Sequence, residues 1–361
     1  MSKYRSLALL VLFLSTLLTF ACGSGTGDNQ SNVVATPTPA PTPTVVPTPP
    51  SYNLEYFAKV SSSEPSDITN FGSDNINDGF TGSPSNVSGF IWKPKPGTQN
   101  SSYVKLEWNS LVNIDEIRLF DSPVGGQIIR KGRIKFENSK DSSKNFDPVD
   151  FENLPDDATT AGIVKGPGSP VDSVKIEISD ATSDAGLAEV VVSGIRVDEE
   201  IAEGNVGLYG HVPLEKGYSS VFGGGGADVG LYRTYLIKNE KKDGTTDSEV
   251  SWVSNGNGTG AFVKMEFDVA YTIKAVYVYD RLEAGKARIK KGVIRFVDAG
   301  SKASFAKSSD PAAPANLLVT DLPTPVISKL IEIDVEELEP GTDANTGISE
   351  VEIIGSYKPA S

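Results

Sequence analysis

The sequence VKLEW at residues 104–108 returns as VKMEF at residues 263–267, and this echo decides the fold. Three more pairs follow in the same order, each roughly 160 residues apart: LFD at 119–121 and VYD at 278–280, KGRIKF at 131–136 and KGVIRF at 291–296, GLAEV at 186–190 and GISEV at 347–351. Solenoid units are much shorter, about 20 to 50 residues. The repeat therefore predicts one whole domain present in two copies.

The repeated segments alternate between apolar and polar residues. Val104, Leu106 and Trp108 alternate with Lys105 and Glu107, and the same pattern runs through residues 174–178 and 331–336. An alternation with a period of two is typical of strands with one buried face. Turn sequences such as DG at 78–79 and PG at 340–341 separate these strands, which we expect to be short. We therefore expect an all-β chain with two tandem antiparallel β-sandwiches of jelly-roll type, at residues 52–200 and 201–361.

The composition excludes several classes of function. The 361 residues include one cysteine and one histidine, so an intramolecular disulfide, a multi-histidine metal site and most histidine-dependent catalysis are excluded. Lys and Arg number 33 against 47 Asp and Glu, a formal net charge of −14. This balance argues against nucleic acid or an anionic membrane surface as the main partner. We expect the single histidine, His211, to face solvent in a loop.

The N-terminus has the pattern of a targeting segment. Lys3 and Arg5 precede an apolar run at residues 7–20, which is shorter than the roughly 20 residues of a membrane span. The run ends in LTFAC, and Cys22 at that place resembles the lipobox cysteine of bacterial lipoproteins, which is diacylated. The alternative is an ordinary cleaved signal with a chance cysteine.

We thus expect residues 1–22 to be a lipoprotein signal peptide. The Pro- and Thr-rich residues 23–51 cannot form a core and are expected to be a disordered, extended linker. Two acyl chains would anchor the protein stably to a membrane. The predicted location is the bacterial cell envelope, lipid-anchored and extracytoplasmic.

Several motifs resemble those of one known family. NINDG at 75–79 followed by Trp92, LFDSP at 119–123 with QI at 127–128, and GLAEVVVSG at 186–194 resemble the motifs of discoidin-like domains, the coagulation factor V/VIII type C class. The second copy keeps YDR at 279–281 and the closing segment at 347–355, without a counterpart of NINDG. The resemblance implies a galactose-binding-like β-sandwich, commonly a carbohydrate-binding or adhesion module.

The resemblance also implies a structural calcium ion. The family's metal-binding aspartate and closing glutamate match Asp78 and Glu189 in the first copy, and Glu350 matches the glutamate in the second. Calcium prefers hard oxygen ligands, which carboxylates and backbone carbonyls provide. The alternative is that Asp78 shapes a turn and Glu189 makes a surface hydrogen bond.

Aromatic and arginine side chains that the copies do not share are candidates for ligand binding. Trp92 and Trp252 match across the repeat and are therefore expected in the core. The candidate ligand-binding residues are Phe80 and Phe90 in the first copy and Tyr232, Arg233, Tyr235 and Arg281 in the second. Aromatic rings stack on sugar rings, and arginines donate to hydroxyls. Alternatively, these side chains only cover the end of the sandwich.

The sequence therefore predicts a non-catalytic surface lipoprotein that binds a glycan or polysaccharide through discoidin-like modules. The alternative is a structural or adhesive protein that binds another surface protein or the cell envelope. A hydrolase with paired carboxylates is a third class. Since no acidic residues form a recognisable catalytic constellation, we do not expect an enzyme.

Overall fold

The computed structural model describes thirteen stretches of the chain: residues 52–66, 71–78, 91–144, 146–156, 159–213, 217–221, 234–238, 240, 242, 251–282, 288–320, 322–340 and 344–359. All of them belong to the compact unit formed by Pro49–Ser361. The expected signal peptide, Cys22 and the linker lie outside the described residues. Within the described part, no helix has the length and apolar character needed to cross a membrane.

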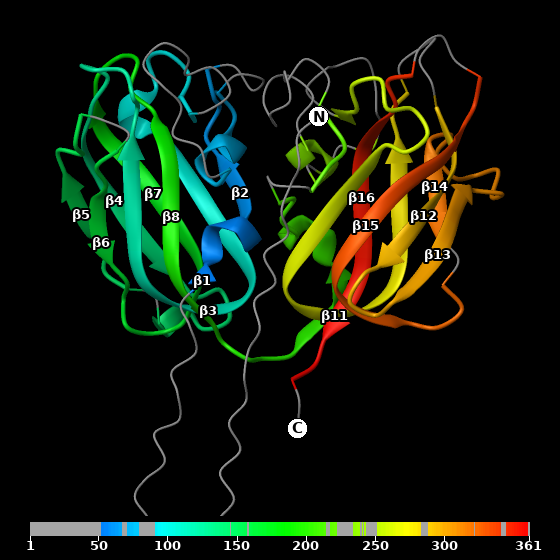
Figure 1. Ribbon diagram of the computed structural model, residues 1–361. Helices are drawn as coiled ribbons and strands as arrows, with labels where there is room; N and C mark the ends of the chain where they lie inside the picture. The colour runs from blue at the N-terminus through cyan, green and yellow to red at the C-terminus, as the bar shows by residue number, and fades with distance from the viewer. Residues whose placement is uncertain are drawn as a thin grey trace, which may run out of the picture. The chain divides into compact units, whose positions relative to one another are not determined.

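In its described residues the first copy has eight strands and four 3-10 turns (Figure 1). The strands are β1 (Tyr52–Asn53), β2 (Lys59–Ser62), β3 (Tyr103–Asp121), β4 (Ile129–Glu137), β5 (Val149–Glu152), β6 (Gly162–Lys165), β7 (Val171–Ala181) and β8 (Leu187–Arg196). The 3-10 turns are η1 (Leu54–Phe57), η2 (Ser73–Ile76), η3 (Gln99–Ser101) and η4 (Ser142–Lys144). All strand pairings are antiparallel, which confirms the expected all-β class.

The long strand β3 belongs to both layers of the first sandwich. Its first part, residues 103–107, pairs with β2 and β7, and β7 continues to β4 and β5. Its second part, residues 112–121, pairs with β8, and residues 116–119 also pair with β6. The register with β7 shifts between Glu107 and Val112, where the strand passes from one layer to the other. The expectation of short strands is therefore wrong for β3, whose 19 residues form one bent strand.

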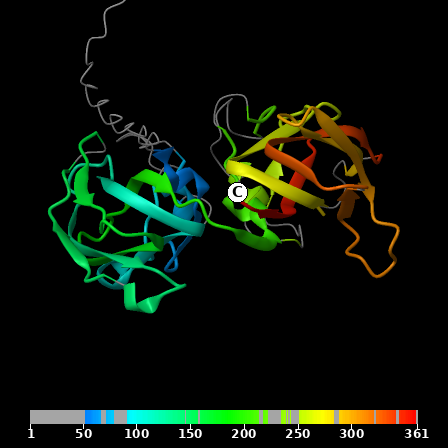
Figure 2. The same ribbon diagram turned by 90° about the horizontal axis from the view of Figure 1, so that it is seen from below.

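The second copy repeats this arrangement. Its strands are β9 (Ile201–Asn205), β10 (Trp252–Val253), β11 (Phe262–Asp280), β12 (Ile289–Phe296), β13 (Ser301–Lys307), β14 (Leu317–Thr320), β15 (Val326–Leu338) and β16 (Gly347–Tyr357), with 3-10 turns η5 (Val206–Tyr209) and η6 (Thr234–Lys238). The strand β11 pairs first with β15 and then with β16 and β14, as β3 does with its partners. In this copy β13 also pairs with β14, so the strands close into a ring around the core (Figure 2).

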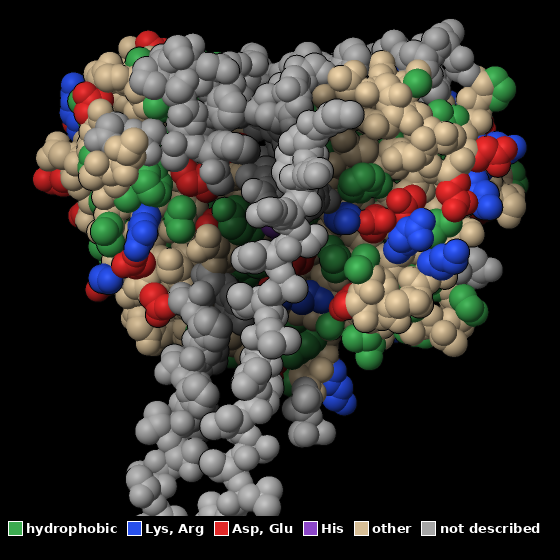
Figure 3. Space-filling view, viewed as in Figure 1, with side chains coloured by type: hydrophobic (Ala, Val, Ile, Leu, Met, Phe, Trp, Pro, Cys, Tyr) green, Lys and Arg blue, Asp and Glu red, His purple; other side chains and the backbone are tan. Residues whose placement is uncertain are grey.

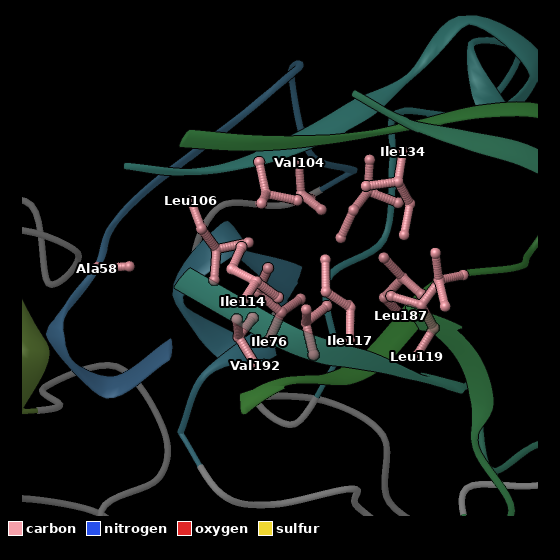
Figure 4. Close-up of a cluster of buried hydrophobic side chains, with 14 of the residues drawn as sticks. Ala58, Ile76, Val104, Leu106, Ile114, Ile117, Leu119, Ile134, Leu187 and Val192 are labelled. Atoms are coloured by element: carbon pink, nitrogen blue, oxygen red, sulfur yellow. The ribbon is translucent and has the colours of Figure 1, made fainter. Parts of the chain in front are cut away.

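The alternating pattern of the sequence is the burial pattern of the strands. In β3 each second residue is buried from Val104 to Ile114 and again from Ile117 to Asp121, and Val104, Leu106 and Trp108 lie in the core. Figure 4 shows apolar side chains from β3 gathered with Ile76 and Val192 between the layers. Trp92 and Trp252 are fully buried, as their match across the repeat predicts. Burying each large apolar side chain contributes about 1.5 to 3 kcal/mol.

The outward faces of the sheets carry ion pairs between neighbouring strands. On β12 and β15, Arg295 lies between Glu332 and Asp334, and Lys264 of β11 also reaches Glu332. Figure 3 shows acidic and basic side chains next to one another on this face. Exposed pairs of this kind contribute little stability individually, about 0 to 1 kcal/mol. These ion pairs nevertheless give the charged side chains named here oppositely charged neighbours.

The single histidine is not a solvent-facing loop residue. His211 forms a backbone bridge with Glu266 of β11 through hydrogen bonds of 2.7 Å in both directions. Its ring stacks on the ring of Tyr56, with 4.5 Å between centroids. Burial, together with the positive charge of Lys238, lowers the pKa of His211 to about 3. The expectation from sequence is therefore wrong, because the residues that cover His211 are distant in the chain.

Candidate functional site

Three segments that carry the repeated motifs meet at one end of each sandwich. In the first copy Asp121, the last residue of β3, lies opposite Leu187, the first residue of β8. Trp92 joins Leu187 from the other side through two backbone hydrogen bonds of 2.8 and 3.0 Å. In the second copy Ile348 lies between Asp280 and Trp252 in the same way. We call this end of each sandwich the loop end.

Most of the candidate ligand-binding residues lie outside the described residues. These are Phe80, Phe90, Tyr232 and Arg233, and the side chain of Tyr235 is also outside the described part. Described residues close to these segments in sequence form hydrogen bonds at the loop end. The Asn75 side-chain amide donates to the Ile91 carbonyl at 2.8 Å, and the Trp252 indole donates to the Ser220 carbonyl at 3.0 Å.

Arg281 is packed into the fold of the second copy. Its exposed fraction is 6%, and its backbone N–H donates to the carbonyl of Gly347 at 3.3 Å. A Cβ atom at Gly347 would lie 3.1 Å from Cδ of Arg281, so the arginine stem runs along the start of β16. Any ligand that this guanidinium contacts must therefore lie directly on the strand ends.

Asp121 and Asp280 hold the strand connections at the loop end. Both are fully buried. Asp121 accepts the N–H groups of Ser122 at 2.8 Å and Ile129 at 2.9 Å, and Asp280 accepts the N–H of Ile289 at 3.2 Å. Burial raises the pKa of each carboxyl group to about 7. These contacts are those of a cap that ties the end of β3 or β11 to the start of the next strand.

Carboxylates gather around Tyr56 in the first copy. Burial, together with the negative charges of Glu55, Glu189 and Asp78, raises the pKa of Tyr56 to about 12. The two residues predicted to bind calcium, Asp78 and Glu189, therefore lie in one neighbourhood. Glu189 is 3% exposed, so the alternative of a surface hydrogen bond is wrong. Glu55 was not expected there, and no repeated motif marks it, because its counterpart in the second copy is Gly207.

The first copy offers calcium a suitable set of donors, although the described residues do not complete a site. Asp78 and Glu189 supply hard carboxylate oxygens, the chemistry that calcium prefers. Within the described part, no group of three or more His, Cys, Asp or Glu side chains is arranged to hold a metal ion. Further oxygens would have to come from backbone carbonyls or from residues outside the described ranges.

The counterpart glutamate of the second copy has different surroundings. Glu350 is fully buried, and its Oε2 accepts the backbone N–H of Glu240 at 2.8 Å. Burial raises the pKa of Glu350 to about 8, while the charge of nearby Lys242 acts in the opposite direction. An N–H donor and an ammonium group repel a metal ion. Glu350 therefore fits a calcium site less well than Glu189.

Comparison with known proteins places the fold in context. Residues 53–193 and 233–354 match the family model described as "Domain of unknown function (DUF7402)". No curated protein matches the chain in sequence.

Three solved structures illustrate the likeness in fold. A fucolectin from striped bass (Morone saxatilis) serum is 16% identical, with a TM-score of 0.33, over 85% of this chain and 99% of that one. The CBM32-1 and CBM32-2 domains of Clostridium perfringens ZmpB, in complex with GalNAc, are 12% identical, with a TM-score of 0.31, over 85% and 92%. Allantoicase from Saccharomyces cerevisiae is 12% identical, with a TM-score of 0.43, over 84% and 93%. At these scores the likeness carries no argument about a ligand.

Proposed function

The chain belongs to the family described as "Domain of unknown function (DUF7402)", and on that premise we propose that it is a non-catalytic surface protein that binds carbohydrate at its loop ends. The family description assigns no function, so the proposal is supported by this chain's own residues. Its motifs resemble those of discoidin-like domains, which are commonly carbohydrate-binding modules. Fold alone does not determine function.

The observation that carries the proposal is the convergence at the loop end. In each copy the last residue of the long central strand, the first residues of the closing strand and a buried tryptophan lie side by side. In the sequence, Phe80 and Phe90 lie between Asp78 and Ile91, and Tyr232 and Arg233 directly precede Thr234. Rigid strand ends that support variable loops are a common way to position binding residues.

For the first copy, calcium is part of the proposal. Asp78 and Glu189 would hold the ion. For the second copy we propose no calcium, because Glu350 is already bound to an N–H group and lies near Lys242.

A glycan array with the full-length protein, run with calcium and with chelator, tests the carbohydrate proposal. We expect binding to defined sugars that is lost in Tyr232→Ala or Tyr235→Ala. Tyr357→Ala is the matched control, because Tyr357 ends β16 at the opposite end of the second sandwich from Gly347. Absence of sugar binding, combined with capture of a defined envelope protein, would instead favour the adhesive alternative.

Calcium has its own measurement. Titration calorimetry of the chelator-treated protein should detect one site, and Asp78→Asn should abolish it while Glu350→Gln should not. An unchanged melting temperature with chelator, together with no heat of calcium binding, would remove the metal from the proposal.

The envelope location is also a proposal, which rests on Cys22. In a bacterial host we expect labelled fatty acid to be incorporated into the protein and the protein to sediment with membranes. Cys22→Ala should prevent both. Incorporation of label into the Cys22→Ala variant would contradict a lipid anchor at this residue.

A further inference from the structure

A cavity of about 350 Å³ opens on the outward face formed by β3, β4 and β7. Its walls include Lys105 and Glu107 of β3, Glu137 at the end of β4 and Asp172 at the start of β7. These positions lie at the opposite end of the strands from Asp121, so the cavity is separate from the loop end. Its volume is at the lower end of the range of small-ligand pockets, about 300 to 1,000 Å³.

The carboxylates of the cavity are held in place by neighbouring groups. Nζ of Lys105 lies 2.9 Å from Oε1 of Glu107 and 3.5 Å from Oε2 of Glu137. Ser173 donates its hydroxyl to Oε2 of Glu137 at 3.1 Å. The carboxylates of Glu107 and Glu137 therefore already hold one ammonium group between them.

The third carboxylate is Asp172, which accepts hydrogen bonds from the backbone N–H and the hydroxyl of Ser139. In the part of the chain that the structure describes, it has no ion-pair partner. Three carboxylates face one ammonium group, so the lining carries a formal charge of −2. A cavity with this charge attracts a cation and repels an anion.

Two aromatic side chains complete the lining. Trp108 donates its indole N–H to the carbonyl of Leu54 at 2.8 Å, so it presents only apolar ring atoms to the cavity. Tyr209 of η5 also lines the cavity. Burial raises the pKa of Tyr209; the charge of Lys59 lowers it, and those of Glu107 and Asp172 raise it. Aromatic rings attract cations as well as the C–H faces of sugar rings.

We propose that this cavity binds a sugar that carries a positively charged amine. The carboxylates of Glu107, Glu137 and Asp172 would accept hydrogen bonds from the ammonium and hydroxyl groups, and Lys105 would donate to a hydroxyl oxygen. The aromatic rings would contact the sugar ring. This inference goes beyond the proposed loop-end site and does not depend on it.

The second copy supplies a natural comparison. Lys264 and Glu266 correspond to Lys105 and Glu107, whereas the position of Glu137 is taken by Val297. Lys264 instead pairs with Glu332 at 2.8 Å. The position of Asp172 is taken by Lys329, so the equivalent face of the second copy lacks two of the carboxylates, and the amine site is expected in the first copy alone.

The test uses glucosamine oligomers and their N-acetylated counterparts of the same length, measured by titration calorimetry on the full-length protein. In mildly acidic buffer the free amines of the oligomers carry a positive charge, whereas the acetylated nitrogens are uncharged amides. We expect the glucosamine oligomers to bind at least tenfold more tightly than the acetylated ones, and binding to weaken with salt. Equal binding of the two series, or no binding of either, would overturn the proposal.

Variants locate the site. Glu137→Val copies the residue of the second copy and should weaken binding at least tenfold, as should Glu107→Gln. Glu152→Gln is the matched control, because Glu152 lies on β5 with a 62% exposed side chain. Equal effects of Glu137→Val and Glu152→Gln would place the binding elsewhere. If a linear polyamine binds as tightly as the amino sugar, the proposal that the cavity recognises a sugar is wrong, and the cavity only prefers cations.

The outcome is separable from the loop-end proposal. Tyr232→Ala should leave binding of glucosamine oligomers unchanged, and Glu137→Val should leave any glycan-array signal of the loop ends unchanged. Loss of glucosamine binding in Tyr232→Ala would assign these oligomers to the loop end and overturn the cavity.

Discussion

Glu55 and Asn205 satisfy the same strand amide in the two copies. Oε2 of Glu55 accepts the N–H of Val192 at 2.8 Å, and Oδ1 of Asn205 accepts the N–H of the equivalent Ile353 at 3.0 Å. The edge strand β1 ends opposite Ser193, so the next amide of β8 has no strand partner on that side. The first copy meets this need with an acid and the second with an amide.

This difference predicts a pH dependence for the first copy. Burial raises the pKa of Glu55 from 4.5 to about 7, against two backbone hydrogen bonds that lower it. The folded state therefore keeps a proton that the unfolded chain releases, so this stabilising contribution is complete below about pH 4.5 and is lost as the pH rises through about 7. Glu55→Gln should raise the free energy of unfolding by about 3 kcal/mol near pH 8 and change it little near pH 4.5.

Urea denaturation across this pH range measures the effect. Asn205→Asp is the converse variant, because it places a carboxylate against the N–H of Ile353 in the second copy. It should make the stability of that copy depend on pH. A Glu55→Gln variant with the same pH profile as the unmodified protein would contradict the burial of a titrating acid.

The lowered pKa of His211 predicts the opposite dependence of stability on pH. Its pKa is lowered from 6.5 to about 3, so below pH 6.5 the unfolded chain takes up a proton that the folded state does not. Stability should therefore fall as the pH falls from about 6.5 toward 3, by at most about 1.4 kcal/mol per pH unit. His211→Phe keeps a ring against Tyr56 and removes the titration. Its stability, measured relative to the unmodified protein, should improve as the solution becomes more acidic; a constant difference between pH 7 and 5 would disprove this.

Arg196 predicts a large loss of stability on truncation. Its side chain is 8% exposed and lies 3.3 Å from Asp268, 2.9 Å from the hydroxyl of Ser110 and 4.4 Å from the ring centroid of Tyr357. Removing one partner of a buried ion pair costs about 3 to 5 kcal/mol because the other charge stays buried. Arg196→Met should show this loss in denaturation experiments. The double variant with Asp268→Asn should recover part of it, and strict additivity of the two losses would argue against coupling.

Alanine substitution at the equivalent residues Gly132 and Gly292 should destabilise each copy in the same way. Each lies opposite an aromatic residue on the neighbouring strand, Phe151 or Phe305. A Cβ atom at either glycine would collide with that ring and with a backbone carbonyl of the adjacent strand. Alanine at either position should cost about 1 to 3 kcal/mol or more, because overpacking forces side chains and backbone to shift. Gly204→Ala is the control, since a Cβ atom there meets nothing within 4 Å; an equal loss in the control would refute the steric explanation.

Much of the architecture could be predicted from sequence because its signals are local. The repeat predicted two copies, and the alternation of apolar residues predicted the buried faces of β3 and β11. The matching tryptophans were correctly assigned to the core. The passage of β3 between two layers was not predicted, although the alternation breaks there, with polar Ser110 buried and apolar Leu111 only half-buried. That strand bends because its two parts pair with different partners.

The candidate sites were only partly predictable. The closing motif pointed to both Glu189 and Glu350. It does not show that Glu189 lies near Asp78, whereas Glu350 accepts a backbone N–H and lies near Lys242. Glu55 and the cavity between β3, β4 and β7 have no motif at all. Phe80, Phe90, Tyr232 and Arg233 stay predictions, since they lie outside the described residues.

The amino-acid sequence by itself determined the duplication, the all-β class and the residues that face each core, because a period of two and a long-range echo are visible along the chain. Only the tertiary structure decided which polar groups are buried and what surrounds them, as for Glu55, His211 and Glu350. The reason is physical: the environment of a charge depends on atoms that are near in space, and in these sandwiches those atoms come from strands far apart in sequence.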